Sequence, residues 1–76
     1  MRNEPYKKLC ELLIQERQKA DITQADLSAR LKRPQSFVSK YERGERRLDV
    51  VEFAHVAKAI GFDPMIFLAS FYREIS

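Results

Sequence analysis

The sequence predicts an all-α protein whose single domain, residues 1–76, contains five helices. A chain of 76 residues is too short for more than one hydrophobic core. It contains only two glycines and three prolines, whereas an all-β chain needs many tight turns. Its apolar residues recur at three- and four-residue spacing in five segments, and each segment begins at a proline or at a residue that caps helices.

The first predicted helix covers about residues 5–19. Pro5 suits its first position, because the N–H that proline lacks is unpaired there in any case. Asp21 follows the helix and tolerates the left-handed backbone that often ends one, although less readily than glycine. The apolar face consists of Tyr6, Leu9, Cys10, Leu13 and Ile14.

The second and third predicted helices have about nine residues each and lie within residues 23–43. Thr23 provides an N-cap for the second helix. Pro34 precedes the third, at about residues 35–43, and Gly44 ends it. The inward-facing residues are Leu27, Ser28 and Leu31 in the former helix and Val38 and Tyr41 in the latter.

The fourth predicted helix begins after Asp49 and ends at Gly61, with Val50, Phe53, Val56, Ala57 and Ile60 as its apolar face. Asp63 caps the fifth helix, at about residues 64–75. The apolar residues of this last helix occupy more than one face, and a small domain cannot bury all of them. Some must close the core, and the set contains candidates for a dimer interface: Ile66, Phe67, Phe71, Tyr72 and Ile75.

Positive charge is concentrated in one part of the chain. Residues 30–47 contain seven basic and two acidic residues, a net charge of +5, whereas the remaining residues sum to −2. Such a basic segment favours binding of a polyanion, and nucleic acid is the first candidate. A solvated loop that happens to be rich in arginine is the alternative.

The turn between the second and third helices is only three residues long, so the two helices must cross sharply. This is the helix-turn-helix arrangement, here at about residues 23–43, in which the second helix of the pair enters the major groove of DNA.

Two stretches of this pair, residues 22–28 (ITQADLS) and 35–44 (QSFVSKYERG), resemble the Cro-type phage repressors, also called the xenobiotic response element (XRE) family. The likeness extends over about residues 9–68. It implies a lambda-repressor-like fold with the helix-turn-helix at helices 2 and 3. It also implies a sequence-specific transcriptional regulator that binds double-stranded DNA.

The resemblance implies that Gln35 and Ser36, at the start of the third helix, contact bases. A glutamine amide can pair with adenine through two hydrogen bonds, and serine can donate or accept one. Ser39 and Lys40 lie one turn further on and face the same groove. For Phe37 two interpretations are equally open: it contacts a thymine methyl group, or it only covers the second helix.

Phosphate contacts are expected on both sides of these residues. The resemblance implies that Gln24 contacts a DNA phosphate and that Arg43 contacts the DNA backbone. Three further arginines fit phosphate contacts on physical grounds: Arg33, Arg46 and Arg47.

The resemblance also pairs Arg17 with Glu42, so that an ion pair ties the recognition helix to the first helix. A free Glu42 carboxylate would repel DNA, and both residues being ordinary surface charges is the alternative. The sequence departs from the family at Lys32 and Asp21, where glycine is often found. A left-handed backbone at Lys32 would cost roughly 1 kcal/mol.

Because one helix pair reads only half of a site, we expect a repressor that binds a pseudo-palindromic operator as a homodimer. The alternative is a protein-interaction or antitoxin module on the same fold, which binds a partner protein through the last helix. An enzyme is disfavoured because no nucleophile is accompanied by a base, and no cofactor motif occurs.

One cysteine, Cys10, permits no internal disulfide and indicates a reducing cytoplasm. Cys10 and the single histidine, His55, cannot form a zinc site within one chain. No apolar run is long enough to span a membrane.

Overall fold

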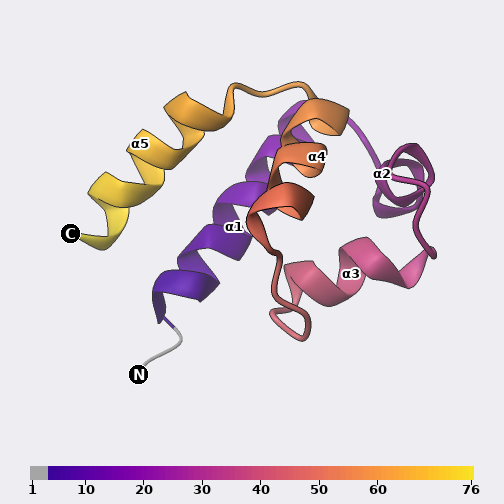
Figure 1. Cartoon of the computed structure of the whole chain (residues 1–76), viewed down its shortest axis with the longest axis horizontal. Helices are drawn as coiled ribbons and strands as arrows, with labels where there is room; N and C mark the ends of the chain where they lie inside the picture. The colour runs from indigo at the N-terminus through magenta and orange to yellow at the C-terminus, as the bar shows by residue number, and fades with distance from the viewer. Residues whose placement is uncertain (1–3) are drawn as a thin grey trace.

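A computed structural model describes residues 4–76, and within them it contains helices and no strand (Figure 1). The five helices are α1 (Glu4–Lys19), α2 (Gln24–Arg30), α3 (Ser36–Glu42), α4 (Val50–Ile60) and α5 (Pro64–Ile75). The predicted all-α class and the five helical segments are confirmed, with boundaries that differ by at most two residues. No helix in the described part of the chain is both long and apolar enough to cross a membrane.

Side-chain caps begin three of the helices where the sequence predicts them. Thr23 accepts a hydrogen bond from the Asp26 amide at 3.0 Å. Asp63 accepts from two amides in the first turn of α5. Asp49 accepts from the Glu52 amide at 2.7 Å, and the Glu52 carboxylate accepts from the Asp49 amide at 3.0 Å. This reciprocal pair is a capping box, which satisfies two amides that the helix itself leaves unpaired.

Left-handed backbone separates consecutive helices. It occurs at Asp21 (φ 59°) after α1 and at Lys32 (φ 57°) after α2. Gly44 (φ 77°) follows α3 and Gly61 (φ 100°) follows α4. Asp21 and Lys32 therefore adopt the conformation that glycine would adopt without strain, at a cost of roughly 1 kcal/mol each.

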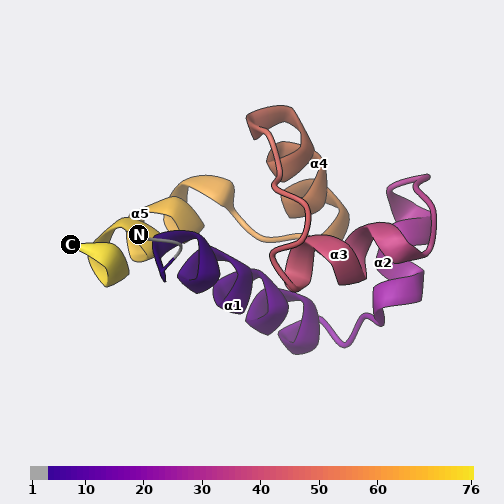
Figure 2. The same cartoon turned by 90° about the horizontal axis from the view of Figure 1, so that it is seen from below.

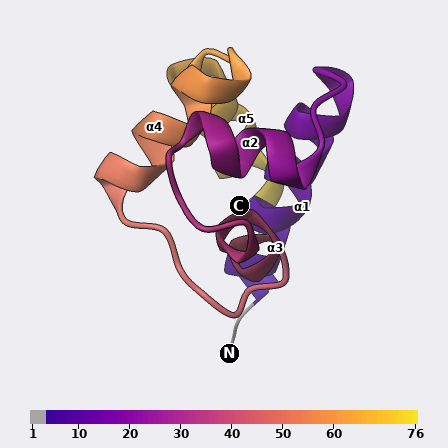
Figure 3. The same ribbon diagram turned by 90° about the vertical axis from the view of Figure 1, so that its right-hand side faces the viewer.

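The core lies where the helix pair meets α1 and the two C-terminal helices. In Figures 1 and 2, α2 and α3 occupy one end of the molecule, and α1 runs beside α5 toward the other. Figure 3 shows α3 nearly end-on beneath α2. The buried cluster consists of Leu13, Ile22, Leu27, Phe37, Val38, Tyr41, Val56, Ile60 and Phe67.

An aromatic cluster attaches α5 to this core. Phe67 is 5% exposed, and its ring centroid lies 5.5 Å from that of Phe53 and 4.9 Å from that of Phe62. Phe67 is therefore a core residue and not part of an exposed interface. Phe71 is partly buried against the hydrophobic core. The sequence predicts Val50 on the apolar face of α4, but this is wrong, because Val50 lies in the first turn and is 82% exposed.

Candidate nucleic-acid interface

Ser28 joins the two helices of the helix-turn-helix. Its side chain is almost fully buried, and its hydroxyl donates to the Gln35 carbonyl at 3.2 Å and accepts from the Val38 amide at 3.4 Å. The Arg33 amide in turn donates to the Ser28 carbonyl at 3.0 Å. A larger side chain would separate α2 from α3, so this small residue sets the position of the recognition helix α3.

The N-terminal ends of α2 and α3 line a shallow open groove. Three of the four predicted base-contacting polar residues, Gln35, Ser36 and Ser39, line it together with Gln24. Gln35 and Ser36 are exposed, and Ser39 is half-buried with its hydroxyl donating to the Ser36 carbonyl at 3.1 Å. Lys40 is exposed at the next position of α3. The groove therefore presents amide and hydroxyl groups that can exchange hydrogen bonds with base edges.

Phe37 does not belong to this surface. It is 6% exposed, and its ring packs edge-on against Tyr41 with the centroids 5.6 Å apart. The guanidinium carbons of Arg33 and Arg46 lie 4.5 and 5.0 Å from the Phe37 centroid. The prediction of a thymine contact is wrong, because the core and two arginines enclose the ring.

Arg17 and Glu42 form an ion pair that connects α1 to the end of α3. The Arg17 Nε donates to Glu42 at 2.7 Å and its Nη2 donates at 3.2 Å, while Nη1 donates to the Ile22 carbonyl at 2.8 Å. The two side chains are 12% and 4% exposed. The charge of Glu42 is thus balanced by Arg17, and Glu42 has a structural role rather than presenting a free charge beside the groove.

Gln24 takes part in the same network. Its amide donates to Glu42 at 2.8 Å, so one of its two N–H groups is occupied. Among residues 4–76 the second N–H and the amide oxygen have no further hydrogen bond, so they remain for an external partner. Gln24 therefore links the start of α2 to the end of α3.

Arg43, at the end of α3, pairs with an exposed neighbour. Its guanidinium donates twice to Glu45, at 2.9 and 3.0 Å, and both side chains are 55% exposed. Hydrogen bonding from Arg43 lowers the pKa of the Glu45 carboxyl. Because solvent surrounds this pair, a phosphate can replace Glu45 at little cost.

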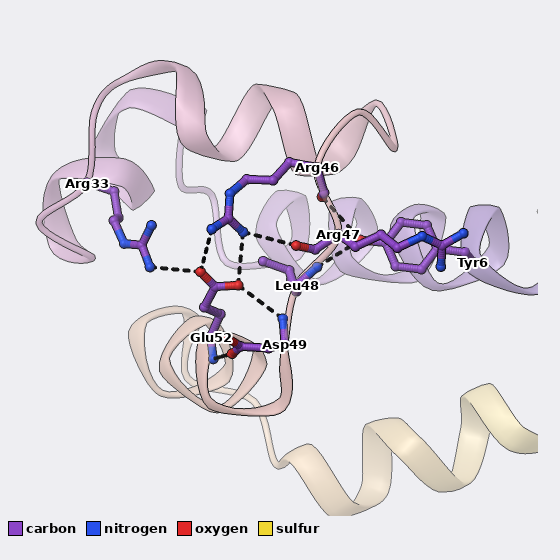
Figure 4. A network of polar contacts seen from close by, with 7 residues as sticks. All are labelled: Tyr6, Arg33, Arg46, Arg47, Leu48, Asp49 and Glu52. Atoms are coloured by element: carbon purple, nitrogen blue, oxygen red, sulfur yellow. Dashed lines mark hydrogen bonds and ion pairs between the residues drawn. The ribbon is translucent and has the colours of Figure 1, made fainter.

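Glu52 holds two of the predicted phosphate-binding arginines at once (Figure 4). It accepts from Arg46 through both guanidinium Nη atoms, at 2.9 and 2.7 Å, and from Arg33 at 2.8 Å. Hydrogen bonding from Arg46, the Asp49 amide and Arg33 lowers the pKa of Glu52 to about 2. Sequence reasoning missed this residue, although the spacing Asp49-x-x-Glu52 is typical of a capping box.

Arg47 and Tyr6 stabilise the loop between α3 and α4. The Arg47 guanidinium carbon lies 4.4 Å from the Tyr6 ring centroid. The Tyr6 hydroxyl donates to the Arg46 carbonyl at 3.3 Å and accepts from the Leu48 amide at 3.2 Å. Tyr6 was predicted only as part of an apolar helix face, and no short-range pattern shows that its hydroxyl reaches this loop.

Comparison with known proteins agrees with this geometry. A helix-turn-helix family model matches residues 13–67, most of the chain. An XRE-family like protein from Pseudomonas syringae pv. tomato strain DC3000 is similar at 49% sequence identity, with a TM-score of 0.91 over 97% of this chain and 90% of that one. A comparison with curated proteins found no match.

More distant structures share the fold. The wild-type restriction-modification controller protein C.Esp1396I is 20% identical, with a TM-score of 0.86 over 97% of each chain. A point mutant of the same controller protein is 23% identical, with a TM-score of 0.86 over 99% of this chain and 95% of that one. The family match and the 49% identical relative together show that this chain belongs to the XRE family of helix-turn-helix, DNA-binding transcriptional regulators.

Proposed function

We propose that this regulator is a cytoplasmic repressor that binds a pseudo-palindromic operator as a homodimer and reads each half-site with Gln35, Ser36, Ser39 and Lys40. The observation that carries the proposal is the groove that Gln35, Ser36 and Ser39 line together on a rigidly supported helix, with Gln35 and Ser36 exposed to solvent. The Arg17–Glu42 ion pair and the Ser28 hydrogen bonds supply that support. A preorganised helix loses little conformational entropy when it enters the major groove.

The chemistry of these side chains assigns them different tasks. The Gln35 amide suits adenine, to which it can both donate and accept. Ser36 and Ser39 accept or donate single hydrogen bonds, and Lys40 donates to guanine or to a phosphate. Gln24, Arg43 and the arginines of the turn and loop would hold the DNA backbone and fix the register without reading sequence.

A homodimer would use the exposed apolar residues of α5. Ile66 and Tyr72 are 70% and 71% exposed, and Ile75 is 41% exposed. Met65, which the sequence analysis left out of the interface, is 71% exposed. A two-fold arrangement would place two recognition helices about 34 Å apart, one turn of DNA.

The proposal is tested by selecting bound sites from random duplex DNA. We expect two inverted half-sites at one fixed spacing. Replacing Gln35 with alanine should lose about 1–3 kcal/mol of discrimination at one base pair in each half-site. The matched control is Gln15→Ala on the exposed side of α1, which should leave the selected site unchanged. Uniform weakening of Gln35→Ala on all sequences would contradict its role in base recognition.

The second candidate is a protein-interaction module that binds a partner through α5, and the exposed apolar residues of that helix favour it. Titration with random duplex DNA at two salt concentrations separates the candidates. Salt-sensitive binding supports the repressor, because released counterions make phosphate contacts depend on salt. Absence of such binding supports the interaction module.

A further inference from the structure

Glu52 lies where three segments of the chain meet. The turn of the helix-turn-helix contributes Arg33, the loop after α3 contributes Arg46, and α4 contributes Glu52 itself (Figure 4). Both guanidiniums also lie over the ring of Phe37, which belongs to the recognition helix. The Glu52 carboxylate therefore fixes the positions of the Arg33 and Arg46 guanidiniums relative to α3.

This carboxylate is not free to move away. Its side chain is 11% exposed, and one of its oxygens, Oε1, also accepts a hydrogen bond from the Asp49 amide in the capping box of α4. A DNA phosphate that displaced Glu52 from the arginines would leave a nearly buried charge without its partners, which is costly. The ion pairs are therefore expected to persist when DNA binds.

The arginines, in contrast, keep donors for an external anion. A guanidinium has five N–H groups. The described ion pair of Arg33 uses Nη2 alone, whereas Arg46 donates three times, through Nη1 to Glu52 and to the Arg47 carbonyl and through Nη2 to Glu52. The Arg33 and Arg46 side chains are 38% and 41% exposed. The net charge of the three groups is +1, so the cluster still attracts a phosphate.

We propose that Glu52 is a positioning residue for DNA binding, which holds Arg33 and Arg46 beside the recognition helix so that their remaining N–H groups meet the phosphate backbone. The inference rests on the proposed function of the chain. Arginine has a large rotamer entropy, and a side chain that is already fixed loses less of it on binding.

The test is Glu52→Gln, measured for affinity to the selected operator and to random duplex DNA. We expect affinity for both duplexes to fall about tenfold, because two arginines must then be immobilised by the DNA itself. The fall is expected although the substitution makes the protein more basic by one charge. Glu11→Gln on the exposed face of α1 is the matched control, because it changes charge equally without touching an arginine, and its affinity should be equal or slightly higher.

A second measurement separates positioning from a merely structural role. In an Arg33→Gln/Arg46→Gln background, Glu52→Gln should have no further effect on DNA affinity. A loss confined to the operator, with random DNA unaffected, would overturn the proposal by indicating displacement of α3. Unchanged or tighter binding by Glu52→Gln would also overturn it, because Glu52 would then compete with phosphate. If the wild-type protein shows no salt-sensitive DNA binding, the proposed function itself fails, and this inference fails with it.

Discussion

Tyr41 combines full burial with a hydroxyl that has no hydrogen-bond partner among residues 4–76. Desolvation raises the pKa of Tyr41, so the hydroxyl stays protonated. An unpaired buried polar group destabilises the folded state, because water satisfies it in the unfolded chain. The residue that anchors the recognition helix in the core is thus not optimal for stability.

Tyr41→Phe should therefore raise the free energy of unfolding by about 1 kcal/mol. Urea unfolding followed by circular dichroism measures the change. Tyr6→Phe is the control, because the Tyr6 hydroxyl has two backbone partners, and its loss should lower the free energy of unfolding by about 1 kcal/mol. A destabilised Tyr41→Phe variant would show that the hydroxyl is satisfied in solution.

Arg17 illustrates the opposite case, a buried charge with good partners. Arg17→Ala leaves the carboxylate of Glu42 nearly buried with Gln24 as its remaining described side-chain partner. The free energy of unfolding should fall by about 3 kcal/mol, and urea unfolding measures it. Lys8→Ala removes only exposed ion pairs, one with Glu11 and one with Glu74, and should cost less than about 1 kcal/mol. A similar loss of stability in Arg17→Ala and Lys8→Ala would refute the claim that the buried ion pair contributes more than the exposed ones.

At the scale of the helix, the start of α4 should be sensitive to acid. Glu52 has a pKa of about 2 in the folded protein, against an ordinary value of 4.5. Because the pKa of Glu52 is lower in the folded protein than in the unfolded chain, its ionised carboxylate stabilises the fold. This contribution is complete above the pKa of the unfolded chain and is lost as the pH falls through the pKa of the folded protein. The stability that Glu52 contributes should therefore be lost between about pH 4.5 and about pH 2.

Urea unfolding at a series of pH values checks this. Wild-type stability should decline through the window, and Glu52→Gln should be less stable at neutral pH but decline less steeply. Glu11→Gln should retain the wild-type slope, because Glu11 lies in an exposed ion pair on α1. Parallel curves for wild type and Glu52→Gln would contradict the assignment.

The two faces of α5 should respond differently to substitution. Ile66→Glu combined with Tyr72→Glu changes exposed residues, so the fold should persist while the proposed homodimer dissociates. Sedimentation velocity measures the association, and circular dichroism checks the fold. Phe67→Ala should instead lower the free energy of unfolding by about 3–5 kcal/mol, because Phe67 fills the core. A glutamate variant that remains as associated as wild type would place the interface elsewhere.

At the scale of the whole molecule, the charge is divided between a basic segment and a mildly acidic remainder. With about eight phosphates contacted by a dimer, the logarithm of the association constant should fall with the logarithm of salt concentration at a slope near −7. Arg46→Gln with Arg47→Gln should flatten that slope without changing the preferred site, because phosphate contacts carry no base information. Fluorescence anisotropy at several salt concentrations, with the preferred site and altered sites, measures both the salt slope and the site preference. An altered site preference in this variant would indicate base contacts from the loop.

The five helices, their caps and the helix-turn-helix could all be predicted from the amino-acid sequence. These features depend on residues within a few positions of each other, as Thr23 with Asp26 or Gly61 after α4 illustrate. The family resemblance added the pairing of Arg17 with Glu42, which are 25 residues apart and which no local pattern joins.

Which apolar side chains are buried could not be predicted and depends on how the helices pack. Phe37 and Phe67 are buried while Ile66 is exposed, although all three are apolar residues that could occupy the core or an interface. The tertiary structure also decided that Arg33 and Arg46 share Glu52, across 19 and 6 residues of chain. The physical reason is that a helical stripe gives the direction of a side chain relative to its own helix, whereas burial and ion pairing depend on how that helix is rotated against its neighbours.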